Sequence, residues 1–324
     1  MQIYAAGVQK RTVIEYTATM KKHLPVLAVL ALFMALVLFS GEAAAGARGG
    51  LDVCAAALAP SLLPFFTLAN LLSALGLPDL LGGLFGGVCT RLFRVSPDGA
   101  QAFFLGLSGG YPLGASVVAD LRRDGRVSRE EAERLLAFCN NSGPAFILGA
   151  AGGIFQSAAA GLLLYVAHVL AAITVGLVFR GRGEMSSGMK PAPTPPVPFG
   201  KALTGAVSRA VSSTMTVCGY VVLFGALLGI LKPLMVLPPL PNALATGFLE
   251  LGSGIAAMAG LAPTPYTLAT AAFLLGWGGL SVHCQTLGVL AGTDIKCARH
   301  LAGRALCGVI AALYTFLGAL ALFQ

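Results

Sequence analysis

The chain has 324 residues, of which 56% are hydrophobic and only 10% are charged, and its formal net charge is +8. Because a soluble domain carries roughly a quarter charged residues, this composition excludes an ordinary soluble protein and indicates an integral membrane protein. The basic residues lie mostly at the ends of apolar segments, as the positive-inside rule describes, and form no dense patch. That distribution argues against nucleic-acid binding.

The sequence contains no sign of a metal or redox centre. Its seven cysteines are scattered without a C-x-x-C pair, and most lie inside apolar runs, where Cys behaves as a small hydrophobic residue. No H-x-x-H or P-loop pattern is present. We therefore expect a protein that is not an enzyme and that has no catalytic residue, metal ion or cofactor.

The N-terminal region, residues 1–50, is predicted to hold a polar extension and a first transmembrane helix over Leu24–Ser40. A cleavable signal is the competing interpretation, because Ala43–Ala47 fits the small-residue cleavage pattern. We favour a retained helix, since membrane proteins of this kind use their first span as an anchor. Whether residues 1–19 are expressed stays open.

Apolar segments fill residues 51–180, the first of two predicted halves. Several are short or interrupted by Gly and Pro, which indicates broken or re-entrant helices. The segments are Leu51–Leu77, Leu80–Phe93, Gln101–Ala119, Leu135–Phe155 and Gly161–Phe179.

A charged hairpin over residues 120–134 separates two of these segments and holds five arginines and five acids. Ser128 and Glu131 have the spacing of a capping box, and Gly125 supplies the turn before it. The arginines place this hairpin, together with the N-terminus, on the cytoplasmic side.

A Pro-rich linker over residues 181–200 is too stiff and polar to span a membrane, and it precedes the second half, residues 201–324. Counting the segments of both halves, we predict an all-α polytopic membrane protein with roughly eight to ten membrane segments. The segments of the second half are Lys201–Leu231, Asn242–Leu261, Thr267–Leu290 and Ala305–Phe323.

The two halves share a short motif. Ala102–Gly106 is echoed by Ala272–Gly276, and each is followed by a Gly-Gly pair and polar side chains. Broken apolar segments in two halves are the best sequence indication of a transporter's binding site, so we predict an internal repeat.

The predicted solute site consists of glycines and neutral polar side chains at these breaks, with one carboxylate. Free N–H groups at the ends of half-helices suit a carboxylate or a polar ring substituent. Glu250 is the only carboxylate within an apolar run, and we expect it to bind solute or to carry a coupling proton or Na⁺. The substrate-binding candidates are Ser108, Gly109, Gly110, Tyr111, Asn140, Asn141, Ser142, Gly143, Glu250, Ser253, Gly278, Gly279, Ser281 and Gln285.

Structural interpretations of the same residues remain open. Small and hydroxyl residues also let helices pack closely, and Glu250 could reach the interface from a helix end. Trp277 is either an aromatic wall of the site or an interfacial anchor. We expect His168, which lies within a span, to pack against a neighbouring helix through one hydrogen bond.

At these residues the sequence resembles a known family. SGGYPLGA, SREEAERLL, NNSGP, ELGSG and FLLGWGGLSVHCQ closely resemble segments of YlbJ-type sporulation integral membrane proteins, and the likeness covers about residues 51–320. The resemblance implies two nucleoside-recognition (Gate) domains and an outline similar to concentrative nucleoside transporters. It also implies transport of a small spore solute, with dipicolinic acid the leading candidate.

The sequence thus predicts a permease in the cell membrane and, in sporulating cells, in the membrane surrounding the forespore. Its expected partners are the lipid bilayer and a small solute, without nucleic acid, and the residues leave homo-oligomerisation open. The coupling ion, H⁺ or Na⁺, also stays open. The rival interpretations are a transporter of nucleosides or other metabolites and a sporulation membrane scaffold that transports nothing.

Overall fold

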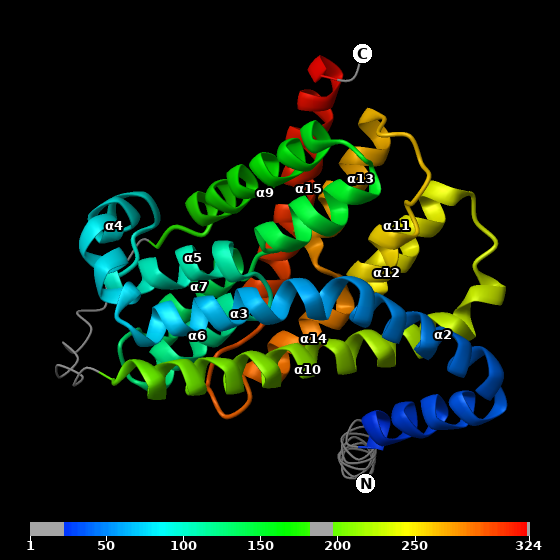
Figure 1. Cartoon of the computed structure of the whole chain (residues 1–324), viewed down its shortest axis with the longest axis horizontal. Coiled ribbons are helices and arrows are strands. Elements are labelled where there is room, and N and C mark those ends of the chain that lie inside the picture. The colour runs from blue at the N-terminus through cyan, green and yellow to red at the C-terminus, as the bar shows by residue number, and fades with distance from the viewer. Residues whose placement is uncertain (1–22, 182–196, 323–324) are drawn as a thin grey trace, which may run out of the picture.

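The computed structural model describes residues 23–181 and 197–322, and it contains helices without a β-strand in those ranges (Figure 1). Helix accounts for 83% of the structure, which confirms the predicted all-α membrane fold. Among these residues, four helices are long and apolar enough to cross a membrane, or five if one bent pair forms a single span. The other helices are shorter, so several of the expected membrane segments do not cross alone.

The elements of the two halves can be followed by colour from blue to red in Figure 1. Those of the first half are α2 (Ser40–Val53), the π-helix η1 (Cys54–Leu58), α3 (Ala59–Ala74), α4 (Leu77–Phe93), α5 (Pro97–Gly109), α6 (Leu113–Arg123), α7 (Arg129–Cys139), the π-helix η2 (Ala145–Ala151), α8 (Gly152–Ile154) and α9 (Ala158–Val178). Those of the second half are α10 (Phe199–Leu231), the 3-10 helix η3 (Lys232–Leu234), α11 (Pro239–Leu249), α12 (Leu251–Ala256), α13 (Pro265–Trp277), α14 (Gly279–Val289) and α15 (Ala298–Leu322).

Packing divides these helices into two bodies. One hydrophobic cluster joins α4–α9 with α11–α15, and a smaller one joins η1, α3 and α10. The long helix α10 runs beside α2 and α3 (Figure 1). We call α2, η1, α3 and α10 the scaffold helices, and α4–α9 with α11–α15 the core body.

Close backbone contact between glycines joins α2 to α10. A Cβ at Gly46 would collide with the carbonyl of Gly225, and one at Gly229 would collide with the carbonyl of Glu42. Small residues four apart allow this approach in membranes, where dispersion and not the hydrophobic effect drives helix association. The first span expected from the sequence ends at Ser40, whereas helix α2 continues through residues 41–50 and bends by 96° from the preceding helix His23–Leu38.

The prolines of the expected second span have a local effect. Pro60 has no N–H to donate and its ring crowds the carbonyl one turn earlier, so the chain widens into the π-helix η1 immediately before it. Pro64 lies inside α3. These residues therefore distort a continuous helical path and do not break it.

The core body repeats one order of elements. A hairpin (α5–α6), an interrupted helix (α7–η2) and a long helix (α9) are followed in the second half by α11–α12, α13–α14 and α15. Glycines close both hairpins, since Gly106 faces Gly114 across the first and Gly254 packs directly on Gly247 across the second. This order supports an internal repeat.

The register of that repeat differs from the one that the sequence suggested. Ala102–Gly106 lies in α5, the first arm of a hairpin, whereas Ala272–Gly276 lies in α13, the first part of an interrupted helix. The order of elements makes α11 the counterpart of α5. The matched motif misled because a glycine with positive φ ends both helices, and this is a common feature of sharp breaks and not evidence of equivalent position.

Side-chain capping shapes the charged hairpin as expected. The Ser128 hydroxyl accepts the Glu131 N–H at 3.1 Å, and Gly125 takes a φ of +69°. In a capping box, the Glu side chain also accepts the backbone N–H of the Ser. Here the Glu131 carboxylate instead accepts the Ser96 N–H at 2.6 Å and so joins α7 to the start of α5. Most of the predicted linker, residues 182–196, lies outside the described residues, as does the predicted extension.

Candidate solute site

Four interruptions of helices meet inside the core body. They are the tip between α5 and α6 at Gly110–Pro112, the break between α7 and η2 at Asn140–Pro144, the tip between α11 and α12 at Glu250, and the break at Gly278 between α13 and α14. Three of them lie where the sequence predicts broken backbone, whereas the break expected at Gly252–Gly254 falls inside α12 and the chain turns at Glu250 instead. The structure brings them together from distant parts of the chain.

Glycine is needed where these interruptions touch. Gly110 has a φ of +78°, and a Cβ there would lie 2.7 Å from the amide nitrogen of Gly143. Gly278 has a φ of +92°, and its Cβ would lie 3.1 Å from the Tyr111 hydroxyl oxygen. Any side chain at either position would strain the backbone and push two interruptions apart.

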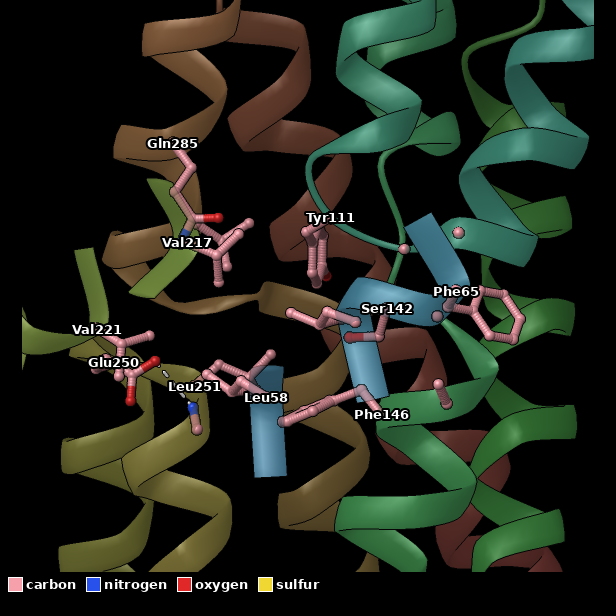
Figure 2. A pocket seen from close by; sticks show the side chains of 17 residues that line it. Leu58, Phe65, Tyr111, Ser142, Phe146, Val217, Val221, Glu250, Leu251 and Gln285 are labelled. Atoms are coloured by element: carbon pink, nitrogen blue, oxygen red, sulfur yellow. Dashed lines mark hydrogen bonds between the residues drawn. The ribbon is translucent and has the colours of Figure 1, made fainter. Parts of the chain in front are cut away.

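A cavity lies between the interruptions and the scaffold helices. Its volume is about 50 Å³, which is room for more than one water molecule. In Figure 2, Glu250 and Val221 lie across the open centre from Phe65, and Tyr111 lies above Ser142. The lining residues are Leu58, Leu62, Phe65, Gly109, Gly110, Tyr111, Ser142, Gly143, Ala145, Phe146, Val217, Val221, Glu250, Leu251, Gly252, Val282 and Gln285.

Glu250 lines this cavity as the N-cap of α12. It is 2% exposed, and its two carboxylate oxygens accept the N–H groups of Gly252 at 3.0 Å and Ser253 at 2.6 Å. A carboxylate at a helix N-terminus is stabilised by the helix dipole and by these bonds. The negative charge of Glu250 is therefore held by the protein itself, inside the core and not at an interface.

The Asn140–Asn141–Ser142 segment forms the buried polar centre of the site. Asn140 donates to the Thr286 hydroxyl at 2.9 Å, and Asn141 donates to the carbonyl of Phe138 at 2.7 Å. Of the three, only Ser142 lines the cavity. Asn140 thus joins the end of α7 to α14, whereas Asn141 bonds back to α7, and both lie behind the cavity wall.

The carbonyl of Leu275 shows how a break creates a polar site. Its ordinary helical partner would be the N–H of Gly279, but α13 ends before that residue. The freed oxygen instead accepts the hydroxyls of Tyr111 at 2.9 Å and Ser142 at 3.3 Å. These two hydrogen bonds join the tip between α5 and α6 and the break between α7 and η2 to the end of α13.

Of the remaining predicted residues, some lie at or near the cavity and one lies away from it. Gln285 lines the cavity, and its Oε1 is buried without a hydrogen-bond partner among the described residues. Ser281 is fully buried near it, and Gly279 packs against the backbone of Leu251. Ser108 is exposed and bonds only to the carbonyl of its own helix, so the structure separates it from the site.

Two further residues were left with alternatives. The Trp277 indole donates to the carbonyl of Phe248 at 3.1 Å and stacks on its ring, and it does not line the cavity. His168 accepts the Ser142 N–H at 3.2 Å, which confirms the expected single bond to a neighbouring element. His168 therefore supports the polar centre from outside, and Trp277 packs on the end of α11.

Arg304 is the functional candidate that sequence reasoning missed. It is 0% exposed, and its guanidinium donates to Asn141 Oδ1 and to the Tyr111 hydroxyl, each at 2.8 Å. In the sequence it ends a short charged turn, Asp294–Arg304, that precedes the expected last span. The signal was available, because Arg304 continues the buried helical stripe of His300, Cys307 and Ala311 on α15.

Two more cavities flank the central one along the scaffold helices. One is lined by Phe66, Asn70, Pro112, Leu113, Ser116, Arg209, Ser212, Ser213 and Val289. The other is lined by Glu42, Ala45, Gly46, Gly49, Gly50, Val53, Gly225, Leu228, Gly229, Lys232, Pro233, Met235, Asn242, Thr246, Ser253, Ala256 and Ala257. We call them the hairpin-side cavity, since Arg123 of the charged hairpin binds the Val289 carbonyl, and the distal cavity.

Comparison with known proteins adds two likenesses. The chain is 34% identical to the sporulation integral membrane protein YlbJ of Bacillus subtilis over 310 residues, which cover 83% of this chain and 76% of that protein. Its fold resembles the solved structure of CNTnw in an outward-facing state, with a TM-score of 0.53, 16% identity, and coverage of 93% of this chain and 85% of that one. No protein-family model matches the chain.

Proposed function

Because the chain belongs to the family of the sporulation integral membrane protein YlbJ, we propose that it is a permease for a small polar solute in spore formation. It acts without covalent chemistry and serves the membrane that surrounds the forespore. Its two halves correspond to two nucleoside-recognition (Gate) domains. The transporter-like fold of the chain supports transport as the activity of the family.

One observation carries this proposal: three of the four helix interruptions line one cavity between two packed bodies, and the fourth, at Gly278, packs against Tyr111 of that lining. Unpaired backbone groups within a membrane cost several kcal/mol each, so broken helices persist only where protein or a polar cavity satisfies them. A protein with a purely structural role has no use for such groups at its centre. A permease uses them to replace the hydration shell of its solute.

Dipicolinic acid is the proposed solute. It is a flat ring with two carboxylates, which suit N–H groups at helix ends. The apolar lining by Leu58 and Val217 suits the faces of its ring. A nucleoside is the second candidate, favoured by the fold likeness and by the neutral polar groups of the cavity wall.

Uptake into proteoliposomes tests the proposal. The full chain is reconstituted, and accumulation of radiolabelled dipicolinate and uridine is compared with that in protein-free vesicles. We expect dipicolinate uptake that saturates. Uptake of uridine alone would make the nucleoside the solute, and a well-folded protein that moves neither would support the membrane scaffold.

A sporulating strain that lacks its own gene of this family provides the test in the cell. We expect the wild-type chain to restore spore dipicolinate, and variants at Asn141, Glu250 and Gln285 to restore it less. Normal spore dipicolinate in the deletion strain would remove dipicolinate as the solute.

A further inference from the structure

Arg304 carries a buried positive charge that the described residues do not neutralise. Its guanidinium bonds Asn141, Tyr111 and the Leu275 carbonyl, which are neutral acceptors, and no carboxylate of the described chain pairs with it. The titratable groups that face it are Tyr111, Cys307, His168, His283 and His300, and no Asp or Glu is among them. An unpaired buried ion costs several kcal/mol, so a charge retained here calls for a role.

The guanidinium is connected to the cavity through Tyr111. The Tyr111 hydroxyl accepts from Arg304 at 2.8 Å and belongs to a ring that lines the cavity, and the guanidinium carbon lies 5.5 Å from that ring's centre. Asn141, its other partner, adjoins Ser142 on the cavity wall. The positive charge therefore lies one residue behind the wall, in a dry setting that screens it weakly.

Glu250, the carboxylate of the cavity wall, forms no ion pair with Arg304. Both of its oxygens are occupied by N–H groups at the start of α12, on the side of the cavity away from Phe65. The two charged groups thus differ in their partners. The Glu250 carboxylate accepts hydrogen bonds from its own helix, whereas the Arg304 guanidinium donates only to neutral oxygens. A bound anion would supply the negative charge that the guanidinium lacks.

We propose that Arg304 sets the charge selectivity of the solute site, so that the site takes carboxylates in preference to neutral molecules of the same shape. This inference rests on the proposed function and deepens it. Arg304 acts through Tyr111 and Asn141 and does not itself touch the solute, so it is a positioning residue. Nothing covalent is involved, and the charge stays fixed while the solute binds and leaves.

Paired ligands of one shape test this proposal. Pyridine-2,6-dicarboxylate is compared with its neutral diamide by thermal shift of the purified full chain and by competition for uptake in proteoliposomes. We expect the wild-type protein to prefer the dicarboxylate, and Arg304→Gln to reduce that preference by at least about tenfold. Arg304→Lys keeps the charge, so it retains the preference with weaker binding of both ligands.

Two further variants keep the outcome interpretable. Thr315→Val, on the same helix and equally buried, should leave the preference unchanged. If Arg304→Gln fails to fold, Tyr111→Phe removes the hydroxyl between guanidinium and cavity, and it should reduce the preference as well. An unchanged preference in a folded Arg304→Gln protein, or in Tyr111→Phe if that protein fails, overturns the proposal.

Failure of this inference can be told apart from failure of the proposed function. A wild-type protein that transports uridine and does not bind the dicarboxylate is still a permease but lacks anion selectivity. That result would reject the role of Arg304 and leave the proposed function standing. A protein that transports nothing yet binds the dicarboxylate through Arg304 loses the proposed function and keeps the anion site.

Discussion

Glu250 illustrates how one side chain can serve both fold and site. It begins α12 by accepting two backbone N–H groups, and the same carboxylate lines the central cavity. A solute or a coupling cation that enters the cavity therefore meets an acid that is already fixed in position. The cap also means that any change of this residue alters the shape of the α11–α12 tip.

We expect Glu250→Gln to lower solute uptake and to change its pH dependence, because the amide keeps one acceptor for the cap but lacks the charge. The lost cap bond should cost about 1 kcal/mol of stability. Uptake into proteoliposomes between pH 5 and 8 measures both effects. Glu130→Gln, an exposed change on the charged hairpin, is the control. Uptake and pH profile at wild-type level in Glu250→Gln would remove the role.

Gln285 and Thr286 are neighbours on α14 with opposite expected roles. The Gln285 Oε1 is buried without a partner, whereas the Thr286 hydroxyl accepts from Asn140. We expect Gln285→Leu to weaken solute binding without lowering the melting temperature. Replacing an unpaired polar group by an apolar one of similar shape can be neutral or stabilising.

The matched change Thr286→Val should do the reverse, lowering stability by about 1 kcal/mol because it leaves the buried Asn140 amide unpaired. Thermal denaturation and solute binding of both variants separate the two roles. A loss of stability in Gln285→Leu equal to that in Thr286→Val would mean that Gln285 is a structural residue.

At the scale of elements, close contact between glycines holds the scaffold together. A Cβ at Gly46 meets the backbone of α10, whereas one at Gly49 meets nothing within 4 Å. We expect Gly46→Ala to destabilise the protein by roughly 1–3 kcal/mol, because backbone cannot move aside as a side chain can. Gly49→Ala should be neutral or stabilise slightly, since alanine favours helix. Equal melting temperatures for the two variants in detergent would contradict the contact between α2 and α10.

An ion pair joins α6 to the loop before α15. Arg122 donates from Nε and from its terminal nitrogen to the two oxygens of Asp294, each bond 2.9 Å long. The hydrogen bond from Arg122 lowers the pKa of Asp294 below its ordinary value of 3.8. The pair therefore contributes stability that is fully present above that value and is lost as pH falls through the lower folded pKa.

Asp294→Asn should consequently lower the melting temperature at pH 7, and the difference from wild type should shrink towards zero near pH 3. Thermal denaturation at both pH values measures this difference, and because the pair is exposed it should also shrink in high salt. Asp124→Asn, on the same exposed face without a side-chain partner in the described chain, should show no such dependence. A difference that is equal at both pH values would show that the charge of Asp294 is irrelevant.

At the scale of the whole molecule, composition was enough to predict a helical membrane protein, and glycines marked the breaks at Gly110 and Gly278, whereas Pro60 and Pro64 did not break their helix. Both predictions follow from local chemistry, because the share of charged residues and the positions of glycines are read directly from the sequence. Which breaks meet depends on packing between distant segments, and the motif match between Ala102–Gly106 and Ala272–Gly276 gave the wrong register. Arg304 was missed for a related reason, since its burial follows from the start of α15 at Ala298.

The three cavities form a row along one face of α10. Ser213 lines the hairpin-side cavity, Val217 and Val221 line the central one, and Leu228 lines the distal one. Their spacing of four or seven residues is that of a single helical stripe. A solute that moves along this stripe would pass between the scaffold helices and the core body, from the side of the charged hairpin to the opposite side.

Single cysteines on α10 test this path. We expect thiols at Val217→Cys and Val221→Cys to react with a charged methanethiosulfonate reagent and to be protected by solute, because only a hydrated thiol ionises and reacts. Ser213→Cys and Leu228→Cys should react from opposite sides of the membrane. Met215→Cys and Leu223→Cys, on exposed faces of the helix that meet lipid, should react slowly. Reactivity above that of the parent protein is measured for each variant in oriented vesicles. Equal reactivity around the whole circumference of α10, or none at Val217 and Val221 with or without solute, would place the path elsewhere.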